Sequence, residues 1–381
     1  MLAQQRHILF LIPTLGAGGA ERVIVTLLNH FDRSKFRLTL AVLDMRGAAF
    51  FEELPSGITV LDLQSTRVRY ALPKIIRLIW KIRPDVAFST LGHLNLALAM
   101  VRPLLPSGTR YVARETITVS EDLRTRKLAK AWGWAYRNFY GRFDHIICQS
   151  DEMRADLAAN FRLPPQKLAL INNPVDVERI ARLASSVPTT YCDYAQDSGN
   201  KDVINFVAAG RLVYQKGFDL LIEAVARSGL KQLMVTVLGA GPLRETLEQL
   251  AREKGVHNQV RFAGLQKNPY AFMAGADAFV LCSRYEGFPN VMLEALACGT
   301  CVIATPAPGG TAEIARSTRG VQLASAVSAE ALSAEFQRFV SNRPNPAHIT
   351  VERFEAGRIA KEYENVFIGN AQGAGTRRHD R

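Results

Sequence analysis

Two cations follow an apolar stretch near the middle of the chain. The stretch "NFVAAG" at residues 205–210 is followed by Arg211 and then by Lys216 and Gly217, where a helical pattern begins. Cations at the carboxyl end of a strand, close to the start of a helix, form a suitable site for phosphate groups. Taken alone, the stretch favours an ordinary solvated turn, so its assignment as a phosphate site depends on the motifs that follow.

Two carboxylates stand near a second helix start, in "SRYEGFPNVMLEALACG". Glu286 precedes Gly287 in a loop, and Glu294 lies eight residues later, inside a predicted helix. Pro289 suits the first turn of that helix, where its missing N–H costs nothing. Carboxylates accept hydrogen bonds from sugar and ribose hydroxyls. The alternative is that Glu286 only stabilises the helix dipole and that Glu294 is solvated.

Three glycine-rich turns each separate an apolar run from a helical pattern: "GAGGAER" near the N-terminus, "LGAGPLRETLE", and "APGGTAEI" with Glu313. Each is a weak signal by itself. The spacing in "GAGGAE" lacks the third glycine of a dinucleotide-binding turn. A nicotinamide-dependent dehydrogenase is therefore the weaker interpretation, with Asp44 as the nearest candidate for its acidic residue.

The elements that must position these residues are apolar runs alternating with helical segments. The runs are "HILFLI", "LTLAVLD", "VAFST", "YVARE", "HIICQS" and "LALINN" in the first half, and "NFVAAG", "MVTVLG", "VRFAG", "AFVLCS" and "CVIAT" in the second. Strands that are apolar throughout and separated by helices predict parallel sheets covered on both faces. The repetition predicts two doubly wound α/β domains, which also suits a chain of 381 residues.

The expected boundaries follow from breaks in this pattern. We expect a first domain over residues 1–183, a polar linker or excursion over 184–202, and a second domain over 203–350. A final helix is predicted over 351–368, and the tail 369–381 has the composition of a disordered segment.

Taken together, the motifs resemble family 4 of the retaining glycosyltransferases, which have the GT-B fold. The ordered set is Arg-x4-Lys-Gly, Gly-x-Gly-Pro-x4-Leu, Glu-Gly-Phe-Pro-x4-Glu and Gly-Gly-x-x-Glu, and it runs through nearly the whole second half. The resemblance implies two Rossmann-like parallel-sheet domains facing a cleft, with the C-terminal helix packing back on the first, acceptor-side domain. The chain departs from the family at Asn173-Pro174-Val175-Asp176, where glycine is often second, and at Cys301, where proline is usual.

The resemblance also implies roles for individual residues. Arg211 and Lys216 would hold the donor diphosphate, and with Glu286 beside the donor sugar they form the predicted catalytic group. The other donor-binding residues would be Glu294, at the ribose hydroxyls, with Gly287, Phe288, Asn290, Gly241, Leu265, Gly18 and Gly19. The candidates on the acceptor and sugar side are Gly16, His93 and Arg114, although a structural histidine explains His93 as well.

The implied reaction leaves negative charge on the diphosphate, and fixed cations stabilise such charge. No Asp-x-Asp sequence occurs in the chain, so a metal ion has no obvious ligand pair, and Arg211 and Lys216 are expected to do its work. We therefore expect no metal site and no cofactor, with a nucleotide sugar, preferably a UDP-sugar, as donor. Retention of the anomeric configuration rests on the resemblance alone.

The composition limits where such a protein works and what it meets. The chain is 48% hydrophobic and carries a formal net charge of +12, which suits an anionic partner. Neither a membrane span nor an export signal is evident, so we expect a cytoplasmic protein. Five cysteines are compatible with a reducing compartment. We interpret Cys298 and Cys301 as buried structural residues, because they lie at a helix C-terminus rather than at an N-terminus.

A basic and aromatic segment over residues 124–143 is the feature most informative about the acceptor. At helical spacing, one face gathers Trp132, Tyr136, Phe139, Tyr140 and Phe143, and the opposite face gathers Arg126, Lys127, Lys130, Arg137 and Trp134. Such a helix can lie on an anionic membrane, which predicts peripheral association with the inner face of the cytoplasmic membrane. The alternative is that the aromatic face packs in the core and the basic face is merely solvated.

The function that the sequence predicts is transfer of a sugar from a nucleotide sugar to a glycan acceptor. We expect that acceptor to be lipid-linked, in surface polysaccharide or glycoprotein glycan assembly. The alternatives are a sugar-nucleotide epimerase or hydrolase of the same architecture, and a glycosyltransferase with a soluble acceptor. A protein that only binds nucleic acid would explain the charge but not the paired glutamates and phosphate loops.

Overall fold

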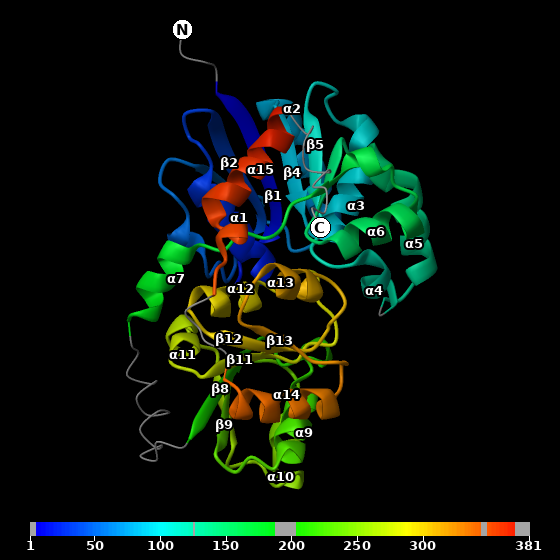
Figure 1. Cartoon of the computed structure of the whole chain (residues 1–381). Helices are drawn as coiled ribbons and strands as arrows, with labels where there is room; N and C mark the ends of the chain where they lie inside the picture. Colours follow the sequence, from blue (N-terminus) through cyan, green and yellow to red (C-terminus); the bar gives the residue numbers. More distant parts are fainter. Residues whose placement is uncertain (1–4, 125, 187–202, 344–348, 370–381) are drawn as a thin grey trace, which may run out of the picture. The chain divides into compact units, whose positions relative to one another are not determined.

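The computed structural model describes residues 5–124, 126–186, 203–343 and 349–369 (Figure 1). It divides into two compact units, which are described separately below. Unit 1 comprises Met1–Pro174 and Ala356–Arg381, and unit 2 comprises Val175–Glu355. Most of the predicted linker, residues 187–202, and the tail 370–381 lie outside the described residues.

Unit 1 is built on a sheet of seven parallel strands in the order β3-β2-β1-β4-β5-β6-β7. The strands are β1 Arg6–Thr14, β2 Phe36–Asp44, β3 Thr59–Asp62, β4 Val86–Thr90, β5 Arg110–Arg114, β6 His145–Cys148 and β7 Leu168–Leu170. The α-helices are α1 Gly19–His30, α2 Val68–Ile82, α3 Gly92–Val101, α4 Val119–Arg124, α5 Ala129–Phe139, α6 Asp151–Phe161 and α15 Ala356–Ile368. Short 3-10 turns are η1 Phe51–Glu53, η2 Arg102–Leu104, η3 Tyr140–Arg142 and η4 Pro165–Lys167.

Unit 2 is built on a sheet of six parallel strands in the order β10-β9-β8-β11-β12-β13. The strands are β8 Ile204–Ala209, β9 Leu233–Leu238, β10 Val260–Gly264, β11 Ala278–Leu281, β12 Cys301–Ala304 and β13 Val321–Leu323. The α-helices are α7 Val177–Ala184, α9 Phe218–Ser228, α10 Arg244–Glu253, α11 Tyr270–Ala274, α12 Asn290–Ala297, α13 Thr311–Ser317 and α14 Ala329–Ser341, with 3-10 turns η5 Tyr214–Lys216 and η7 Glu352–Phe354.

Successive side chains of a strand point to opposite sides of the sheet. Because the strands are apolar at consecutive positions, each sheet is apolar on both faces. In β1, Leu9 and Leu11 pack toward α2, α3, α5 and α6, whereas Ile8 and Phe10 pack toward α1 and α15. In unit 2, α9, α10 and α14 cover one face, and α7, α11, α12 and α13 cover the other. These layers confirm the prediction of two doubly wound parallel-sheet domains.

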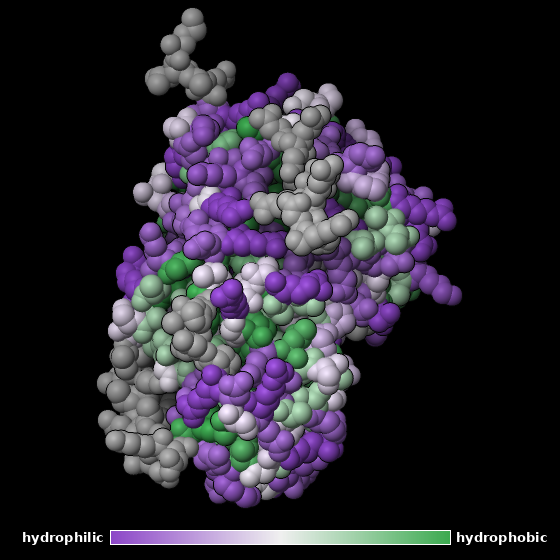
Figure 2. All heavy atoms as spheres, viewed as in Figure 1, coloured by the Kyte–Doolittle hydropathy of each residue, from purple (hydrophilic) through white to green (hydrophobic). Residues whose placement is uncertain are grey.

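The C-terminal helix α15 completes unit 1. Phe367 stacks on Phe31, with ring centroids 5.6 Å apart, and also meets Phe10 and Phe88. Tyr363 packs edge-on against Phe88. The prediction that the last helix returns to the first domain is thus confirmed. Hydrophilic residues predominate on the face of unit 1 that carries α1 and α15 in Figure 2.

Two segments differ from the sequence-based description. Residues 177–183, which we expected at the end of the first domain, form α7, where Ile180 is buried in a core cluster that includes residues of α11 and α12. The last helix begins at Ala356 rather than 351. The residues before it form η7, and Phe354 is buried in unit 2, where its carbonyl accepts the amide of Val175.

Candidate active site

The candidate donor site lies at the carboxyl edge of the unit 2 sheet. The strand order reverses between β8 and β11, and ligands of open α/β sheets bind beside such a switch point. Arg211 follows β8 and is exposed, without an ion pair among the described residues. Lys216 ends η5, just before α9, and Glu286 lies in the loop after β11. The fold therefore brings the loops of all three predicted catalytic residues to one edge.

Lys216 and Glu286 form an ion pair. The distance between Lys216 Nζ and Glu286 Oε1 is 2.6 Å, and the side chains are 22% and 7% exposed. The Ser283 hydroxyl donates to the same carboxylate oxygen, also at 2.6 Å. The aliphatic part of Lys216 lies against the backbone of Gly210. A buried carboxylate needs such partners to stay charged, and an incoming phosphate would compete with it for the lysine.

A second ion pair joins the loop that carries Glu286 to the first turn of α9, just after Lys216. Arg284 donates from Nη1 to Asp219 Oδ1 at 2.8 Å and from Nη2 to Oδ2. Although burial raises the pKa of the Asp219 carboxyl, hydrogen bonds from Arg284 bring that pKa below its ordinary value. The Arg284 guanidinium also lies 4.0 Å from the centre of the Tyr214 ring.

Backbone contacts complete the connection. The Arg284 amide donates to the carbonyl of Gln215 at 2.8 Å, and the Gln215 side chain donates to the carbonyl of Tyr285 at 3.0 Å. Gly217, at φ +65°, lets the first loop approach the second, because a Cβ there would overlap the carbonyl of Cys282. The positions of Lys216 and Glu286 are therefore fixed by one interlocked pair of loops.

Gly241 supports the neighbouring Arg211 turn. A Cβ at this position would lie 2.5 Å from the carbonyl oxygen of Leu212, so only glycine permits the approach. The Leu212 amide donates to Ala240, and the Leu243 amide donates back to Leu212. The predicted donor residue Gly241 thus holds the turn that carries Arg211 in place.

The remaining predicted donor residues lie around the same edge. The Gly287 carbonyl accepts the amide of Gly310 at 2.9 Å. Phe288 is buried and packs against Phe354, so only its backbone can face a ligand. Asn290 begins α12, and Glu294 lies one turn further along, both half-buried. Leu265 follows β10 and is 74% exposed, which leaves its apolar surface available to a nucleotide base.

The N-terminal glycines lie at the carboxyl edge of the unit 1 sheet. Helix α1 begins at Gly19, with Gly18 as an N-cap that has no side chain to cap it. Glu21 folds back over this start: its carboxylate lies where a Cβ of Gly18 would be and accepts the Thr14 hydroxyl at 2.8 Å. Gly16 packs near the carbonyl of Gly47. An acidic side chain of the protein itself thus lies at the positive end of α1.

Arg114, at the end of β5, is 1% exposed. Its guanidinium donates to the Thr90 hydroxyl at 3.2 Å and to Asn173 Oδ1 at 2.7 Å, whereas its Nε–H has no partner in the described part of the chain. The two acceptors come from the ends of β4 and from the segment after β7. This cation ties neighbouring strand ends together through neutral groups.

His93 lies in the first turn of α3, after the neighbouring strand β4. Burial lowers the pKa of its imidazole, Arg126 lowers it further, and Asp122 opposes them. The lowered pKa favours the neutral form of the ring.

Glu115 was not among the predicted site residues. It follows β5 directly and is 1% exposed, and burial raises the pKa of its carboxyl to about 8. Asn95 Nδ2 donates to it at 3.3 Å. The signal in the sequence was the charged pair Arg114-Glu115 at the end of an apolar strand, where ligands of parallel sheets bind.

The segment 124–143 differs from the predicted membrane helix. It does not form one helix, since α4 ends at Arg124 and α5 begins at Ala129. Its predicted anchors pack into the core instead: Tyr136, Tyr140 and Phe143 are buried, and Trp132 and Phe139 are partly buried. The residues left exposed include Lys127, Leu128, Lys130, Trp134 and Arg137. The alternative for the aromatic face, packing on the domain core, is therefore the correct one.

Three absences hold for the parts of the chain that the structure describes. No group of three or more His, Cys, Asp or Glu side chains is arranged to hold a metal ion. None of the helices has the length and hydrophobicity needed to span a membrane. Cys298 is half-buried and Cys301 is buried; burial raises the pKa of Cys298 to about 12 and raises that of Cys301, so neither is a reactive thiolate.

Two family descriptions together match nearly the whole chain. Residues 17–179 match "Glycosyltransferase Family 4", and residues 194–354 match "Glycosyl transferases group 1". The boundary between the two matches falls close to the division between units 1 and 2.

Similar proteins of known name include two bacterial enzymes. The chain is 45% identical over 303 residues to the lipopolysaccharide core biosynthesis glycosyltransferase LpsE of Rhizobium meliloti, covering 77% of each protein. It is 30% identical over 314 residues, 80% of this chain and 81% of the relative, to the N-acetylgalactosamine-N,N'-diacetylbacillosaminyl-diphospho-undecaprenol 4-alpha-N-acetylgalactosaminyltransferase of Campylobacter jejuni. Among solved structures, Anabaena HepE in complex with UDP matches with a TM-score of 0.77 at 18% identity, covering 95% of this chain and 100% of that one.

Proposed function

The chain belongs to family 4 of the glycosyltransferases, and from that premise we propose that it transfers a sugar from a UDP-sugar to a lipid-linked glycan with retention of configuration. The observation that carries the proposal is the Lys216–Glu286 pair at the switch point of the unit 2 sheet. It combines a cation for the donor diphosphate with a carboxylate for the donor sugar.

We assign donor binding to unit 2. As the sugar–phosphate bond breaks, charge accumulates on the leaving diphosphate, and Arg211 and Lys216 neutralise it. Lys216 is released by Glu286 to do so, and Glu286 then turns its carboxylate to sugar hydroxyls while Ser283 still orients it. Glu294 accepts the ribose hydroxyls, and exposed Leu265 lies along the base. No metal ion takes part in this scheme.

UDP is the proposed nucleotide because the structurally similar HepE has been solved with UDP and with UDP-glucose. Apart from Leu265 at the base, the residues of this scheme contact the diphosphate, the ribose and the sugar. GDP- and ADP-sugars have the same diphosphate and ribose. Which sugar is carried depends on contacts around Glu286 that differ between donors.

We assign acceptor binding to unit 1, and we propose a lipid-linked acceptor because of the relatives. One relative is named for lipopolysaccharide core biosynthesis and another for a diphospho-undecaprenol substrate. Such acceptors keep their lipid in a bilayer, so we propose that the protein works at the cytoplasmic face of the membrane. In unit 1, Gly16, His93 and the region of Arg114 lie at the carboxyl edge that faces the acceptor in this scheme.

Release of nucleotide that depends on an added acceptor is the test. Purified protein is incubated with UDP-, GDP- or ADP-sugars, with and without short-chain polyprenyl-diphosphate glycans, and both the nucleotide and the glycolipid product are measured. The proposal expects product from a UDP-sugar only when the lipid-linked acceptor is present. Nucleotide release without any acceptor would instead indicate an epimerase or hydrolase, and equal transfer to a lipid-free oligosaccharide would indicate a soluble acceptor.

A further inference from the structure

The segment between β3 and β4 is strongly basic up to Asp85, its last residue. From residue 63 to residue 84 it contains six cations and no acidic residue: Arg67, Arg69, Lys74, Arg77, Lys81 and Arg83. Most of this segment is α2, which is 15 residues long. At 1.5 Å per residue the helix offers a basic strip of about 20 Å.

Helix α2 has one buried face and one exposed face. Ala71, Ile75 and Ile79 are buried against the unit 1 core. The opposite face exposes Arg69, Tyr70, Pro73, Lys74, Arg77, Trp80 and Lys81. The apolar contacts that hold the helix in unit 1 therefore leave its cations in solvent.

These cations have no acidic partners. None of the six forms an ion pair among the residues that the structure describes. Arg69 donates to the Tyr70 hydroxyl and lies over that ring, and Arg83 lies over the ring of Trp80. The positive charge of α2 is thus available to an anionic surface, with aromatic rings placed directly beside it.

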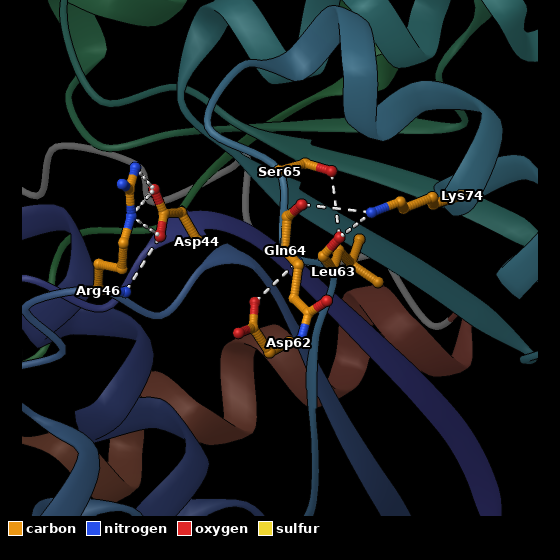
Figure 3. A network of polar contacts seen from close by, with 7 residues as sticks. All are labelled: Asp44, Arg46, Asp62, Leu63, Gln64, Ser65 and Lys74. Carbon is orange, nitrogen blue, oxygen red and sulfur yellow. Dashed lines mark hydrogen bonds and ion pairs between the residues drawn. The ribbon is translucent and has the colours of Figure 1, made fainter.

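Lys74 differs from the other cations because it bonds to the backbone of unit 1. Its ammonium donates to the carbonyls of Leu63 and Gln64, at 2.7 and 3.2 Å. Figure 3 shows the side chain reaching from α2 to the loop after β3, where Gln64 is held by Asp62. This contact ties the middle of α2 to the loop after β3.

Exposed aromatic and apolar side chains extend the surface near both ends of α2. The Trp80 indole N–H donates to the carbonyl of Leu104 at 2.9 Å, which joins α2 to η2. Tyr70 is 58% exposed, Trp80 46% and Leu104 63%. Tryptophan and tyrosine are suited to membrane interfaces, because one end of each ring is apolar and the other forms hydrogen bonds.

The segment around α5 is a weaker candidate for the same role. Arg124 and Arg126 are paired with Glu121 and Asp122, and Arg137 donates to the carbonyl of Asn160. Only Lys127 and Lys130 remain as exposed cations without a described partner. Acidic neighbours thus neutralise part of the charge there, whereas α2 has none in its own sequence.

We propose that the exposed face of α2, extended by Leu104, docks unit 1 on an anionic lipid bilayer. The inference rests on the proposed lipid-linked acceptor, since docking would bring unit 1 to the surface where that acceptor lies. Charge complementarity carries it: an unpaired basic strip with interfacial aromatic rings matches anionic headgroups above an apolar layer.

Vesicle sedimentation tests the docking surface without any enzymatic activity. Vesicles contain equal parts of phosphatidylglycerol and phosphatidylcholine, or phosphatidylcholine alone, at a salt concentration of about 0.1 M. Each cation near an anionic surface changes partitioning about five-fold, so R77Q/K81Q should bind about 25-fold more weakly than the wild type. The matched variant K127Q/K130Q, in the first turn of α5 and just before it, should lose less than five-fold. Unchanged melting curves check that both variants fold.

Three results would overturn the inference. Binding by R77Q/K81Q at the wild-type level is one, and an equal loss in K127Q/K130Q is another. The third is tighter, α2-dependent binding of a short DNA duplex at the same salt, which would indicate a nucleic acid instead. Transfer to a short-chain, detergent-soluble acceptor separates the two proposals: it stays unchanged in R77Q/K81Q if only docking is affected, and it is absent in the wild type if the proposed function is wrong.

Discussion

Charged side chains have opposite surroundings at the carboxyl edges of the two sheets. In unit 2, Lys216 pairs with Glu286 and Arg284 with Asp219, and Arg211 stays exposed. In unit 1, Arg114 and Glu115 are buried and make hydrogen bonds chiefly to neutral groups.

The difference indicates that one edge is suited to binding a charged ligand and the other to a structural role. A cation that is paired near solvent can exchange its carboxylate partner for an anionic ligand. The diphosphate of a donor requires such a cation. The buried charge of Arg114, held by neutral partners, ties strand ends together and is not available to a ligand, and the neighbouring Glu115 keeps its proton. The edge of unit 2 is therefore suited to charged phosphates, and the edge of unit 1 is suited to holding a fixed frame for neutral hydroxyls.

The largest effect on activity should follow the loss of Lys216, the cation that can exchange Glu286 for a diphosphate. Lys216→Ala should lower kcat about 10²–10³-fold, by analogy with removal of one oxyanion-stabilising donor. Steady-state kinetics with the preferred donor measure this, and Lys231→Ala, which removes an exposed lysine between α9 and β9, is the control. Normal turnover in Lys216→Ala would remove the basis for assigning the donor diphosphate to this edge.

At the unit 1 edge, we expect a large effect of pH on stability rather than on turnover. Because the folded pKa of Glu115 is raised to about 8, the folded state holds a proton that the unfolded state releases above about pH 4.5. Stability is therefore lost as pH rises toward 8, and Glu115→Gln should avoid about 4 kcal/mol of that loss.

Urea unfolding across this pH range measures the difference between Glu115→Gln and the wild type. The variant should gain stability relative to the wild type at pH 8 and lose most of that advantage near pH 5. Glu52→Gln, at an exposed position in η1, is the control and should show no such trend. A constant difference at all pH values would mean that Glu115 does not carry the proton.

A smaller effect is expected from the pair that only positions the unit 2 site. Arg284→Ala should raise the donor KM or lower kcat about tenfold, because Lys216 and Glu286 lose their fixed spacing. Asp219→Ala should have the same effect, and the double variant should be no worse than either single one. Arg343→Ala breaks another Arg–Asp pair of unit 2, with Asp277, and is the matched control. Additive losses would show that the two residues act separately.

The smallest expected effect is that of a chelator. If Arg211 and Lys216 supply the positive charge at the diphosphate, excess EDTA should change the rate of transfer less than about two-fold. The assay is the same acceptor-dependent nucleotide release, with added Mg²⁺ as the reverse test. Abolished activity that Mg²⁺ restores would mean that the two cations are not sufficient.

The fold was largely predictable from the sequence because both sheets are parallel and buried on both faces. Strands such as "HILFLI" and "AFVLCS" are apolar without alternation, which predicts this architecture directly. That the loops of Arg211, Lys216 and Glu286 share one sheet edge was predictable too, since each residue follows a predicted strand or precedes a predicted helix.

Other features depended on tertiary contacts that no local pattern contains. Glu115 has a raised pKa only because helices and neighbouring strands bury it, and burial cannot be read from the triplet "RET". The aromatic residues of α5 showed the spacing of a membrane helix, but that spacing is also the spacing of a core-facing helix. The Arg284–Asp219 pair joins residues 65 positions apart, which only the fold brings together.

The return of α15 to unit 1 has a consequence for how the chain is made. All of unit 2, residues 175–355, leaves the ribosome before the helix that covers Phe10, Phe31 and Phe88. Unit 1 therefore exposes an apolar sheet face until α15 is synthesised. Chaperones bind exposed apolar surface of this kind. A released chain that ends at residue 355 should accordingly have a protease-resistant unit 2 and a protease-sensitive unit 1.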